Sequence, residues 1–274
     1  MNIRKLEKKA GQLRLDVLDM VFNSKAGHIG GSFSGMDILV ALYYYLMDVG
    51  KILRSDPDRD RFVLSKGHCA EALYAVLADQ GFFTKDELRT FTHFGTRLAE
   101  HPTRDIPGIE IATGALGHGL SVGIGMALFL RADRVPAHVY VLMGDGEQAE
   151  GSVWEAAMAA AKFGLANLTA IIDRNRLQIS GCTEDVMPVG NLEEKYRAFG
   201  WQALVCDGHD FSQLIPALAT RVPDRPVVVI AETIKGRGSK VMENIAEWHH
   251  QIPTATEYQT IKADLEKMIQ EVSP

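Results

Sequence analysis

Short apolar runs of strand length alternate with helical patterns along most of the chain, and this alternation restricts the possible folds more than any other feature. The runs that indicate strands are 61–65, 139–143, 168–172, 202–206 and 227–231. The helical patterns among them are 71–79, 152–162 and 211–221. Strands joined through helices form right-handed crossovers, which build a parallel sheet covered by helices on both faces. The sequence therefore predicts an α/β protein, a three-layer domain with a mostly parallel sheet.

The two ends of the chain predict further helices. Near the N-terminus, apolar residues recur at steps of three and four, as on one face of a helix that ends near 24–27. These residues are Ile3, Leu6, Ala10, Leu13, Val17 and Val21. Ser34, with Asp37 three residues later, has the pattern of an N-cap, so we expect a second helix to begin there and to include the apolar run 38–47. A helix from about 254 to 272 would form a C-terminal tail, and with no repeat or linker we expect 1–274 to be a single domain.

Composition excludes several classes of protein. Hydrophobic residues make up 46% of the 274 and charged residues 23%, which is ordinary for a globular protein. The net charge of −6 argues against a nucleic-acid or anionic-membrane partner, because such surfaces need clustered Lys and Arg. The three cysteines form no CxxC pair, so neither a disulfide framework nor a zinc site is indicated. The charged N-terminal segment is unlike a signal peptide, and no apolar run could span a bilayer. We expect a cytoplasmic protein that binds neither nucleic acid nor membranes.

Two polar segments follow neighbouring predicted strands. GDGE at 144–147 and DRNRL at 173–177 each come directly after an apolar run. One helix lies between the segments, so the two strands can be parallel neighbours, with Asp145 and Asn175 side by side at their carboxyl ends. Ligands of open α/β sheets bind at that edge.

The donor atoms of these segments suit a divalent cation. A carboxylate, an amide oxygen and a backbone carbonyl form the hard-oxygen set that Mg²⁺ prefers, and diphosphate oxygens can complete the octahedron. Gly144 and Gly146 let the backbone approach a ligand, and the N-terminus of the following helix favours an anion. The residues alone leave open a second interpretation, a tight strand-to-helix turn with a structural aspartate.

The paired segments resemble the GDG…N pattern of the thiamine-diphosphate enzymes, which implies their cofactor-binding fold of the diphosphate-binding (PP) type. The resemblance implies that Asp145, Asn175 and the carbonyl of Leu177 bind Mg²⁺, which Ca²⁺ or Mn²⁺ can replace. Arg174 and Arg176 stand where many members carry an acidic residue or Asn, and a Gly. We expect this departure to affect flanking positions and not the metal ligands.

Further segments, in the order in which transketolase has them, narrow the resemblance to that family. KAGHIGG at 25–31 is similar to its SGHPG segment, and RFVLSKGH at 61–68 to its RFVLSxGH segment. EHP at 100–102 and TGALGHG at 113–119 are similar to its HP…TGxLGQG loop, and KGRG at 235–238 with WH at 248–249 to its KGRG…WHG. Together these matches cover nearly the whole chain in order, which indicates the family more strongly than any one of them.

The resemblance implies roles for the histidines of these segments. His28 and His101 would bind substrate hydroxyls and transfer protons, and imidazole suits both tasks near neutral pH. His68 and His249 would lie beside the diphosphate and the substrate, as cofactor contacts and further catalytic residues. Lys235 would contact the diphosphate as a point charge. The remaining implied cofactor contacts are Gly114, Ala115, Leu116 and Gly146. Taken singly, any of the histidines could be an ordinary buried or surface residue.

Other positions carry no assigned role or carry two interpretations. His118 stands where the family usually has Gln, and His250 where it usually has Gly. Glu150 and Glu155 fit a solvated helix face, whereas in the transketolase pattern acidic residues there lie at the dimer interface and connect the paired cofactors. The glycines of 117–125 have the wrong spacing for a dinucleotide loop and indicate a helix that packs closely on a neighbour.

The resemblance implies transketolase activity, the transfer of a two-carbon ketol unit from a ketose to an aldose, with sugars or sugar phosphates as substrates. Transketolases bind the pyrimidine ring of the cofactor and activate it with a Glu of the next domain, and too few residues follow His249 for such a domain. We therefore expect the N-terminal subunit of a split transketolase, active with a C-terminal subunit that carries the pyrimidine-binding domain, two copies of each. Alternatives are a 2-oxoacid dehydrogenase or deoxyxylulose-phosphate synthase-like subunit, and a non-catalytic regulatory subunit. The pathway, pentose phosphate or a specialised sugar catabolism, stays open.

Overall fold

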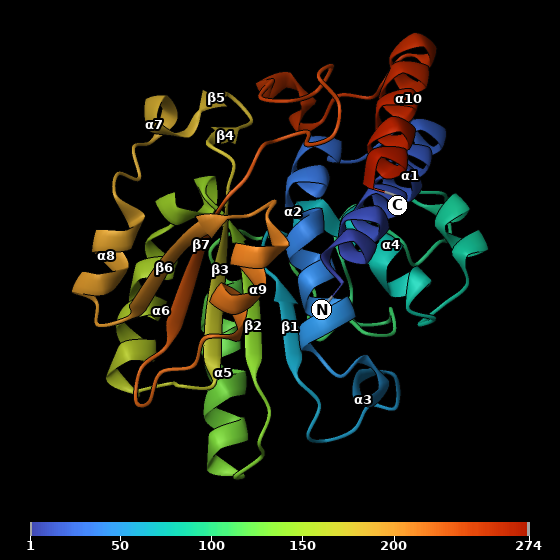
Figure 1. Cartoon of the computed structure of the whole chain (residues 1–274). Helices are drawn as coiled ribbons and strands as arrows, with labels where there is room; N and C mark the ends of the chain where they lie inside the picture. Colours follow the sequence, from blue (N-terminus) through green and yellow to red (C-terminus); the bar gives the residue numbers. More distant parts are fainter. Residues whose placement is uncertain (1, 273–274) are drawn as a thin grey trace.

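A computed structural model describes residues 2–272, and its centre is a parallel sheet. The strand order is β1 (Arg61–Leu64), β2 (Val139–Gly144), β3 (Leu168–Arg174), β7 (Val227–Glu232) and β6 (Gln202–Asp207). Every neighbouring pair in this sheet is parallel. Helices cover both faces (Figure 1). The predicted three-layer α/β fold with a parallel sheet is confirmed.

The strands are apolar because the sheet is buried on both faces. Every residue of β3 is buried, and in β2 and β7 only the last residue is partly exposed. β6 lies at the edge of the sheet, and its Val205 is 49% exposed. Successive side chains point to opposite faces, so Tyr140 and Leu142 of β2 belong to one hydrophobic cluster while Val139 and Val141 belong to the other.

Each cluster joins the sheet to one layer of helices. The first layer contains α1 (Ile3–Ser24), α2 (Ile29–Ala41), α4 (Ala70–Asp79) and α9 (Phe211–Ala219), and the second contains α5 (Gly119–Ala132), α6 (Gly151–Lys162) and α8 (Leu192–Ala198). α10 (Ala255–Val272) packs on α1 and buries Ile261 and Leu265, so the expected tail is a docked helix. The single-domain division stays a prediction, which the shared sheet supports. Among residues 2–272, no helix combines the length and the apolarity that a membrane crossing requires.

Short elements connect these layers. They are α3 (Val49–Leu53), α7 (Thr183–Val186), the hairpin strands β4 (Leu177–Gln178) and β5 (Gly181–Cys182), the π-helical turn η1 (Leu42–Leu46), and the 3₁₀ turns η2 (Gly67–Cys69), η3 (Lys85–Thr90), η4 (Gly146–Ala149) and η5 (Ala246–His249). The β4–β5 hairpin and α7 lie beyond the carboxyl ends of the strands, at the top of Figure 1. They cover the edge of the sheet at which the sequence places the site.

The second helix begins earlier than the sequence predicts. α2 starts at Ile29, and Ser34 lies buried inside it instead of capping it. The Ser34 hydroxyl donates to Asp173 Oδ2 at 2.6 Å, across 139 positions of the chain. The predicted N-cap was wrong because this hydroxyl satisfies a buried tertiary partner, and buried polar groups need one.

Candidate active site

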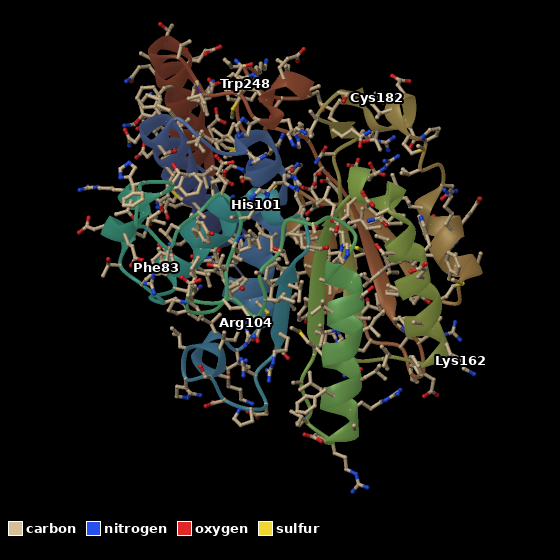
Figure 2. All side chains as sticks on the ribbon, turned by 180° about the vertical axis from the view of Figure 1, so that it is seen from behind. Phe83, His101, Arg104, Lys162, Cys182 and Trp248 are labelled. Carbon is tan, nitrogen blue, oxygen red and sulfur yellow. The ribbon has the colours of Figure 1, made fainter. Side chains whose placement is uncertain are left out.

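A cavity of about 500 Å³ opens at the carboxyl ends of β2 and β3. Its lining brings together nearly all of the predicted site residues: His28, His68, His101, Gly114, Leu116, Asp145, Gly146, Asn175, Leu177, Lys235 and His249. Ala115 is exposed and does not line the cavity. Figure 2 labels His101, Cys182 and Trp248, which mark three of the segments around this end of the sheet. Residues that are far apart in the chain thus share one cavity.

The expected metal ligands lie on one wall of the cavity. Gly144 of β2 pairs with Asp173 of β3, so the turns that carry Asp145 and Asn175 are adjacent. Asp145 is 2% exposed, and burial, with the Asp173 charge in second place, raises the pKa of its carboxyl. The Leu177 backbone N donates to Asn175 Oδ1 at 3.1 Å, which holds the amide beside the Leu177 carbonyl. These three oxygen groups fit a hard divalent cation, whose charge would offset the cost of burying the Asp145 carboxylate.

Two arginines act directly on this wall, which corrects the expectation that they affect only flanking positions. Arg174 Nη1 lies 3.3 Å from Asp145 Oδ2, and Arg174 Nη2 lies 2.6 Å from Glu184 Oε1. The backbone N of Arg176 donates to the same Asp145 oxygen at 2.6 Å, while its guanidinium pairs with Glu232 at 2.8 Å. The Arg174 side chain and the backbone N of residue 176 therefore hold the Asp145 carboxylate in place, because the chain turns back onto the GDGE segment after β3.

The predicted histidines gather around His28. Its ring centroid lies 5.3 Å from those of His68 and His249, and 5.9 Å from that of His101. The four rings come from four separate segments of the chain, and all of them line the cavity. The structure therefore joins the four histidines into one cluster, which their sequence positions alone do not reveal.

His28, His68 and His249 are uncharged near neutral pH. Burial, followed by the charges of neighbouring histidines, lowers the pKa of His28 to about 3. Burial also lowers the pKa of His249 to about 3 and that of His68 well below its ordinary value. A neutral imidazole donates from one ring nitrogen and accepts at the other, which suits sugar hydroxyls.

The Lys235 side chain lies between the expected metal ligands and the histidine cluster. Its Nζ lies 3.3 Å from the Leu177 carbonyl oxygen and 3.0 Å from His249 Nδ1. Burial, with the Lys66 charge in second place, lowers the pKa of Lys235 to about 8. Lys235 is thus still cationic at neutral pH. An anionic group bound between the expected metal ligands and the histidine cluster would stabilise its charge. This is the environment that a diphosphate needs.

A buried glutamate fixes the position of His28. The His28 backbone N donates to Glu71 Oε1 at 2.5 Å, and the Ser32 hydroxyl donates to Oε2 at 2.8 Å. Gly27 has a φ of +127°, and a Cβ there would collide with the same carboxylate. Glycine therefore permits both the backbone conformation and the close approach. Burial raises the pKa of Glu71 to about 7.

Glu71→Gln should remove one contribution to the pH dependence of stability between about pH 5 and pH 7, which opposes that of the buried histidines. The pKa of Glu71 is raised in the folded protein from 4.5 to about 7, so within this window the folded state binds more protons than the unfolded state. The contribution of Glu71 to the free energy of unfolding should therefore fall as the pH rises, by up to roughly 3 kcal/mol, and its loss in Glu71→Gln should make the measured slope more positive. Glutamine keeps the shape and the bond to His28 but does not titrate. Urea unfolding at several pH values measures the slope.

The matched control for this prediction is Glu266→Gln, on an exposed position of α10. This variant should keep the slope of the unsubstituted protein. An unchanged slope in Glu71→Gln would show that Glu71 is ionised in the folded protein at acid pH, contrary to the prediction.

Three buried charged residues support the cavity, and no sequence pattern predicted them. Lys66 Nζ contacts Asp173 Oδ2. Burial alone would raise the pKa of Asp173, but the Lys66 charge and its hydrogen bond hold it below its usual range. Glu147 accepts from the backbone N of Gly144 at 3.0 Å and of Gly117 at 2.8 Å, so it joins two loops of the site. All three residues lie inside or beside the quoted motifs, but nothing local in the sequence marks them as buried.

The positions without a firm assignment lie in different environments. Glu150 and Glu155 are exposed, and Glu150 borders the cavity; their interface role stays a prediction. His118 is exposed, with its Nδ1 3.2 Å from the Leu116 carbonyl oxygen. His250 packs against His28, with 4.6 Å between the ring centroids.

Of the glycines after residue 117, Gly123 serves the predicted helix packing, whereas Gly125 is exposed. They belong largely to α5, and Gly123 lies where this helix meets the sheet. A Cβ on Gly123 would come within 2.5 Å of Val141 Cγ2. Glycine therefore allows α5 to approach β2 closely, as the predicted close-packed helix requires.

The sequence matches a family model described as transketolase, thiamine diphosphate binding domain, over residues 6–267. It is 45% identical over 274 residues to an apulose-4-phosphate transketolase subunit of Phocaeicola vulgatus, covering 99% of this chain and 98% of the relative. It is 40% identical over 265 residues to a 6-deoxy-6-sulfo-D-fructose transketolase subunit of a Clostridium species, covering 96% of each chain.

Solved transketolase structures have the same fold. The transketolase of Leishmania mexicana matches with a TM-score of 0.84 and 28% identity, over 97% of this chain and 45% of that one. The transketolase of Campylobacter jejuni matches with a TM-score of 0.84 and 26% identity, over 99% of this chain and 47% of that one. This chain therefore spans about half the length of these solved transketolases.

The sheet, the cavity at its carboxyl edge and these matches define a protein with the thiamine-diphosphate-binding fold, as predicted. The chain belongs to the transketolase family and corresponds to its N-terminal, thiamine-diphosphate-binding domain. The sequence-based identification of the family is confirmed, and the dehydrogenase and synthase alternatives are not favoured.

Proposed function

We propose that this chain is the N-terminal subunit of a split transketolase, which transfers a two-carbon ketol unit from a ketose to an aldose together with a C-terminal subunit. The observation that carries the proposal is one cavity shared by the wall of Asp145, Asn175 and Leu177 and by the histidine cluster. Relatives that match over nearly their full length are themselves named as single subunits of transketolases, which supports a second chain. Two copies of each chain would give two sites related by a two-fold axis.

The metal and the diphosphate would bind on the wall of the cavity at the carboxyl ends of β2 and β3. Asp145, Asn175 and the Leu177 carbonyl would hold Mg²⁺, or Ca²⁺ or Mn²⁺ in its place, because their oxygens suit hard cations. Lys235 would neutralise diphosphate oxygens as a point charge. The remaining proposed cofactor contacts are His68, Gly114, Leu116, Gly146 and His249, whereas the exposed Ala115 lies outside the cavity. This arrangement leaves the other side of the cavity for the sugar.

The histidines would position the sugar and move its hydroxyl protons. The cofactor, when bound, supplies the carbon chemistry by which a two-carbon unit leaves one sugar and joins another. His28 and His101 would bind the hydroxyls near the reacting carbons. Because the pKa of His28 is lowered to about 3, its ring is neutral and has a free nitrogen that can accept a hydrogen bond from a sugar hydroxyl.

We infer that the donor is a ketose with an anionic end. The two relatives are named for apulose 4-phosphate and for 6-deoxy-6-sulfo-D-fructose, which carry a phosphate and a sulfonate. Catabolism of such a ketose is the pathway that we favour, with the pentose phosphate pathway as the alternative. The three free cysteines, Cys69, Cys182 and Cys206, fit a reducing cytoplasm.

Ketol transfer by the chain assembled with its partner tests the proposal. With Mg²⁺, thiamine diphosphate and ribose 5-phosphate as acceptor, the pair should form a new ketose from apulose 4-phosphate, 6-deoxy-6-sulfofructose or xylulose 5-phosphate. Mass spectrometry of the products measures the reaction. Absence of a new ketose with every donor, in a pair that binds the cofactor, would overturn the proposal.

In the same assay, His28→Ala and His101→Ala should slow ketol transfer by roughly 10²–10⁴-fold and keep cofactor affinity. Both side chains line the cavity at the histidine cluster, which the proposal gives to the sugar and not to the metal. His93→Ala, at an exposed position near His101 in the chain, is the matched control and should keep full activity. Full turnover in both variants would show that His28 and His101 have no role in ketol transfer. Loss of cofactor binding would show that the cofactor site and the sugar site overlap.

A further inference from the structure

Glu100 and His250 lie beside His28, just outside the residues that line the cavity, and the proposed reaction uses neither of them. His250 Nε2 lies 3.5 Å from Glu100 Oε2, and His28 Nδ1 lies 3.9 Å from the same oxygen. The side chains of Glu100 and His250 are 31% and 53% exposed, while that of His28 is 13% exposed. The three groups therefore lead from solvent into the cavity.

The three groups are close together without being hydrogen-bonded. Both distances exceed the roughly 2.7–3.2 Å of an N–H···O hydrogen bond. Among residues 2–272, His28 Nδ1 is buried without a hydrogen-bond partner, and the Glu100 carboxylate makes only these two long contacts. A buried ring nitrogen without a partner costs free energy and is uncommon. Its presence at the cavity points to a ligand that supplies the missing partner.

The charges of the three groups select a neutral hydroxyl group as that ligand. A hydroxyl can donate to the Glu100 carboxylate and accept from an imidazole N–H at the same time. An anion is disfavoured, because Glu100 carries a negative charge and His28, with its pKa lowered to about 3, adds no positive charge. The phosphate or sulfonate of the substrate must therefore bind elsewhere.

The positions of Glu100 and His250 relative to the inner end of the cavity indicate which part of the sugar can reach them. The transferred carbons would have to reach the cofactor inside the cavity, whose inner residues Asp145 and Lys235 are each 2% exposed. Glu100 and His250 lie on the solvent side of His28. They are therefore placed for the carbons that stay with the leaving fragment.

We propose that Glu100, His250 and His28 form a subsite for a hydroxyl of the donor ketose, on the fragment beyond the two transferred carbons. The inference rests on the proposed function and adds a determinant of donor specificity to it. His250 stands where the transketolase pattern usually has Gly, so the imidazole is an addition that a glycine could not replace. The subsite makes the chain selective for donors with a hydroxyl in that place.

Comparison of two donors in the assembled pair tests the subsite. Hydroxypyruvate provides the same two-carbon unit but releases CO₂, which has no hydroxyl for the subsite. His250→Gly should lower the ratio of kcat/KM for the best ketose donor to that for hydroxypyruvate by roughly 10- to 100-fold. Glu100→Ala should lower it similarly, and Glu100→Gln, which keeps an acceptor oxygen, should lower it less. His93→Gly, at an exposed histidine outside the cavity, is the control and should keep the ratio.

A binding measurement supports this test without turnover. D-Arabinitol 5-phosphate is a polyol phosphate that has no ketone and cannot be cleaved. Calorimetry on the assembled pair should show its Kd rising roughly 10-fold in His250→Gly, as expected for a lost hydrogen bond. An unchanged Kd, together with an unchanged kcat/KM ratio, would overturn the subsite.

Two other results would also overturn the proposal. Equal losses of kcat/KM for the ketose and for hydroxypyruvate would mean that the two side chains only support the fold around His28. The three ligand atoms also lie within 4.8 Å of one another, close enough for a transition metal. Tight, stoichiometric Zn²⁺ binding that His250→Gly abolishes would assign them to a metal instead.

A wild-type pair that transfers from ketose donors but gives any of these results refutes the subsite alone, whereas a pair that transfers from no donor refutes the proposed function.

Discussion

Asp145→Asn should weaken Mg²⁺-dependent binding of thiamine diphosphate by more than roughly 100-fold, because it removes the one carboxylate from the proposed metal wall. Asn175 and the Leu177 carbonyl offer only neutral oxygens. The fold should be preserved, since the amide oxygen can still accept from the Arg176 backbone N, although the Gly146 backbone N loses the acceptor that it now has in Asp145 Oδ1. Burial raises the pKa of Asp145, so the ionised carboxylate is already unfavourable in the folded chain without metal. The free energy of unfolding at pH 7 without metal should therefore not decrease.

Calorimetric titration of the assembled pair with thiamine diphosphate, with and without Mg²⁺, measures the loss. Asn175→Ala should show the same defect. Asp133→Asn, at an exposed position just after α5, is the matched control and should bind the cofactor normally. Normal Mg²⁺-dependent affinity in Asp145→Asn would remove this wall from consideration as the metal site.

The chain by itself should show no ketol transfer, and activity should appear only with the C-terminal subunit. The described residues supply groups for a diphosphate and for sugar hydroxyls, but the side of the cavity formed by the β4–β5 hairpin and α7 is apolar and open. Ile179, Val186 and Met187 line the cavity there and are 75%, 44% and 55% exposed. Exposed apolar residues at a cavity mouth indicate a surface that another chain covers. A cofactor buried between the two chains should also tighten their association by mass action.

Light scattering and the ketol-transfer assay, each with and without Mg²⁺ and thiamine diphosphate, measure assembly and activity together. A complex with two copies of each chain is the expected product. Met187→Asp should weaken assembly, whereas Phe94→Asp, at an exposed position away from the cavity, should not. Robust turnover by the separate chain would contradict the split-subunit proposal.

The sequence by itself determined the architecture and the proximity of Asp145 and Asn175, the proposed metal ligands. Strand and helix periods are set by local backbone geometry, so alternating apolar runs were sufficient to predict the parallel sheet and its two helical layers. Asp145 and Asn175 each follow a strand directly, and parallel neighbouring strands end at the same edge, so their proximity could be predicted from order alone. The transketolase motifs then identified Lys235 and the four cavity histidines.

Only the tertiary structure decided which partners the buried polar groups have. Ser34 has the local pattern of a helix cap, yet it bonds to Asp173, 139 positions away, because burial makes that partner necessary. Glu71 beneath His28, and Arg174 on Asp145, are likewise contacts between segments that local patterns cannot connect. The meeting of Glu100 and His250, 150 positions apart in the numbering, depends on how two loops fold over His28. Local sequence determines the periodicity of helices and strands. The hydrogen-bond partner of a buried polar side chain depends instead on which other side chains the packed layers bury beside it.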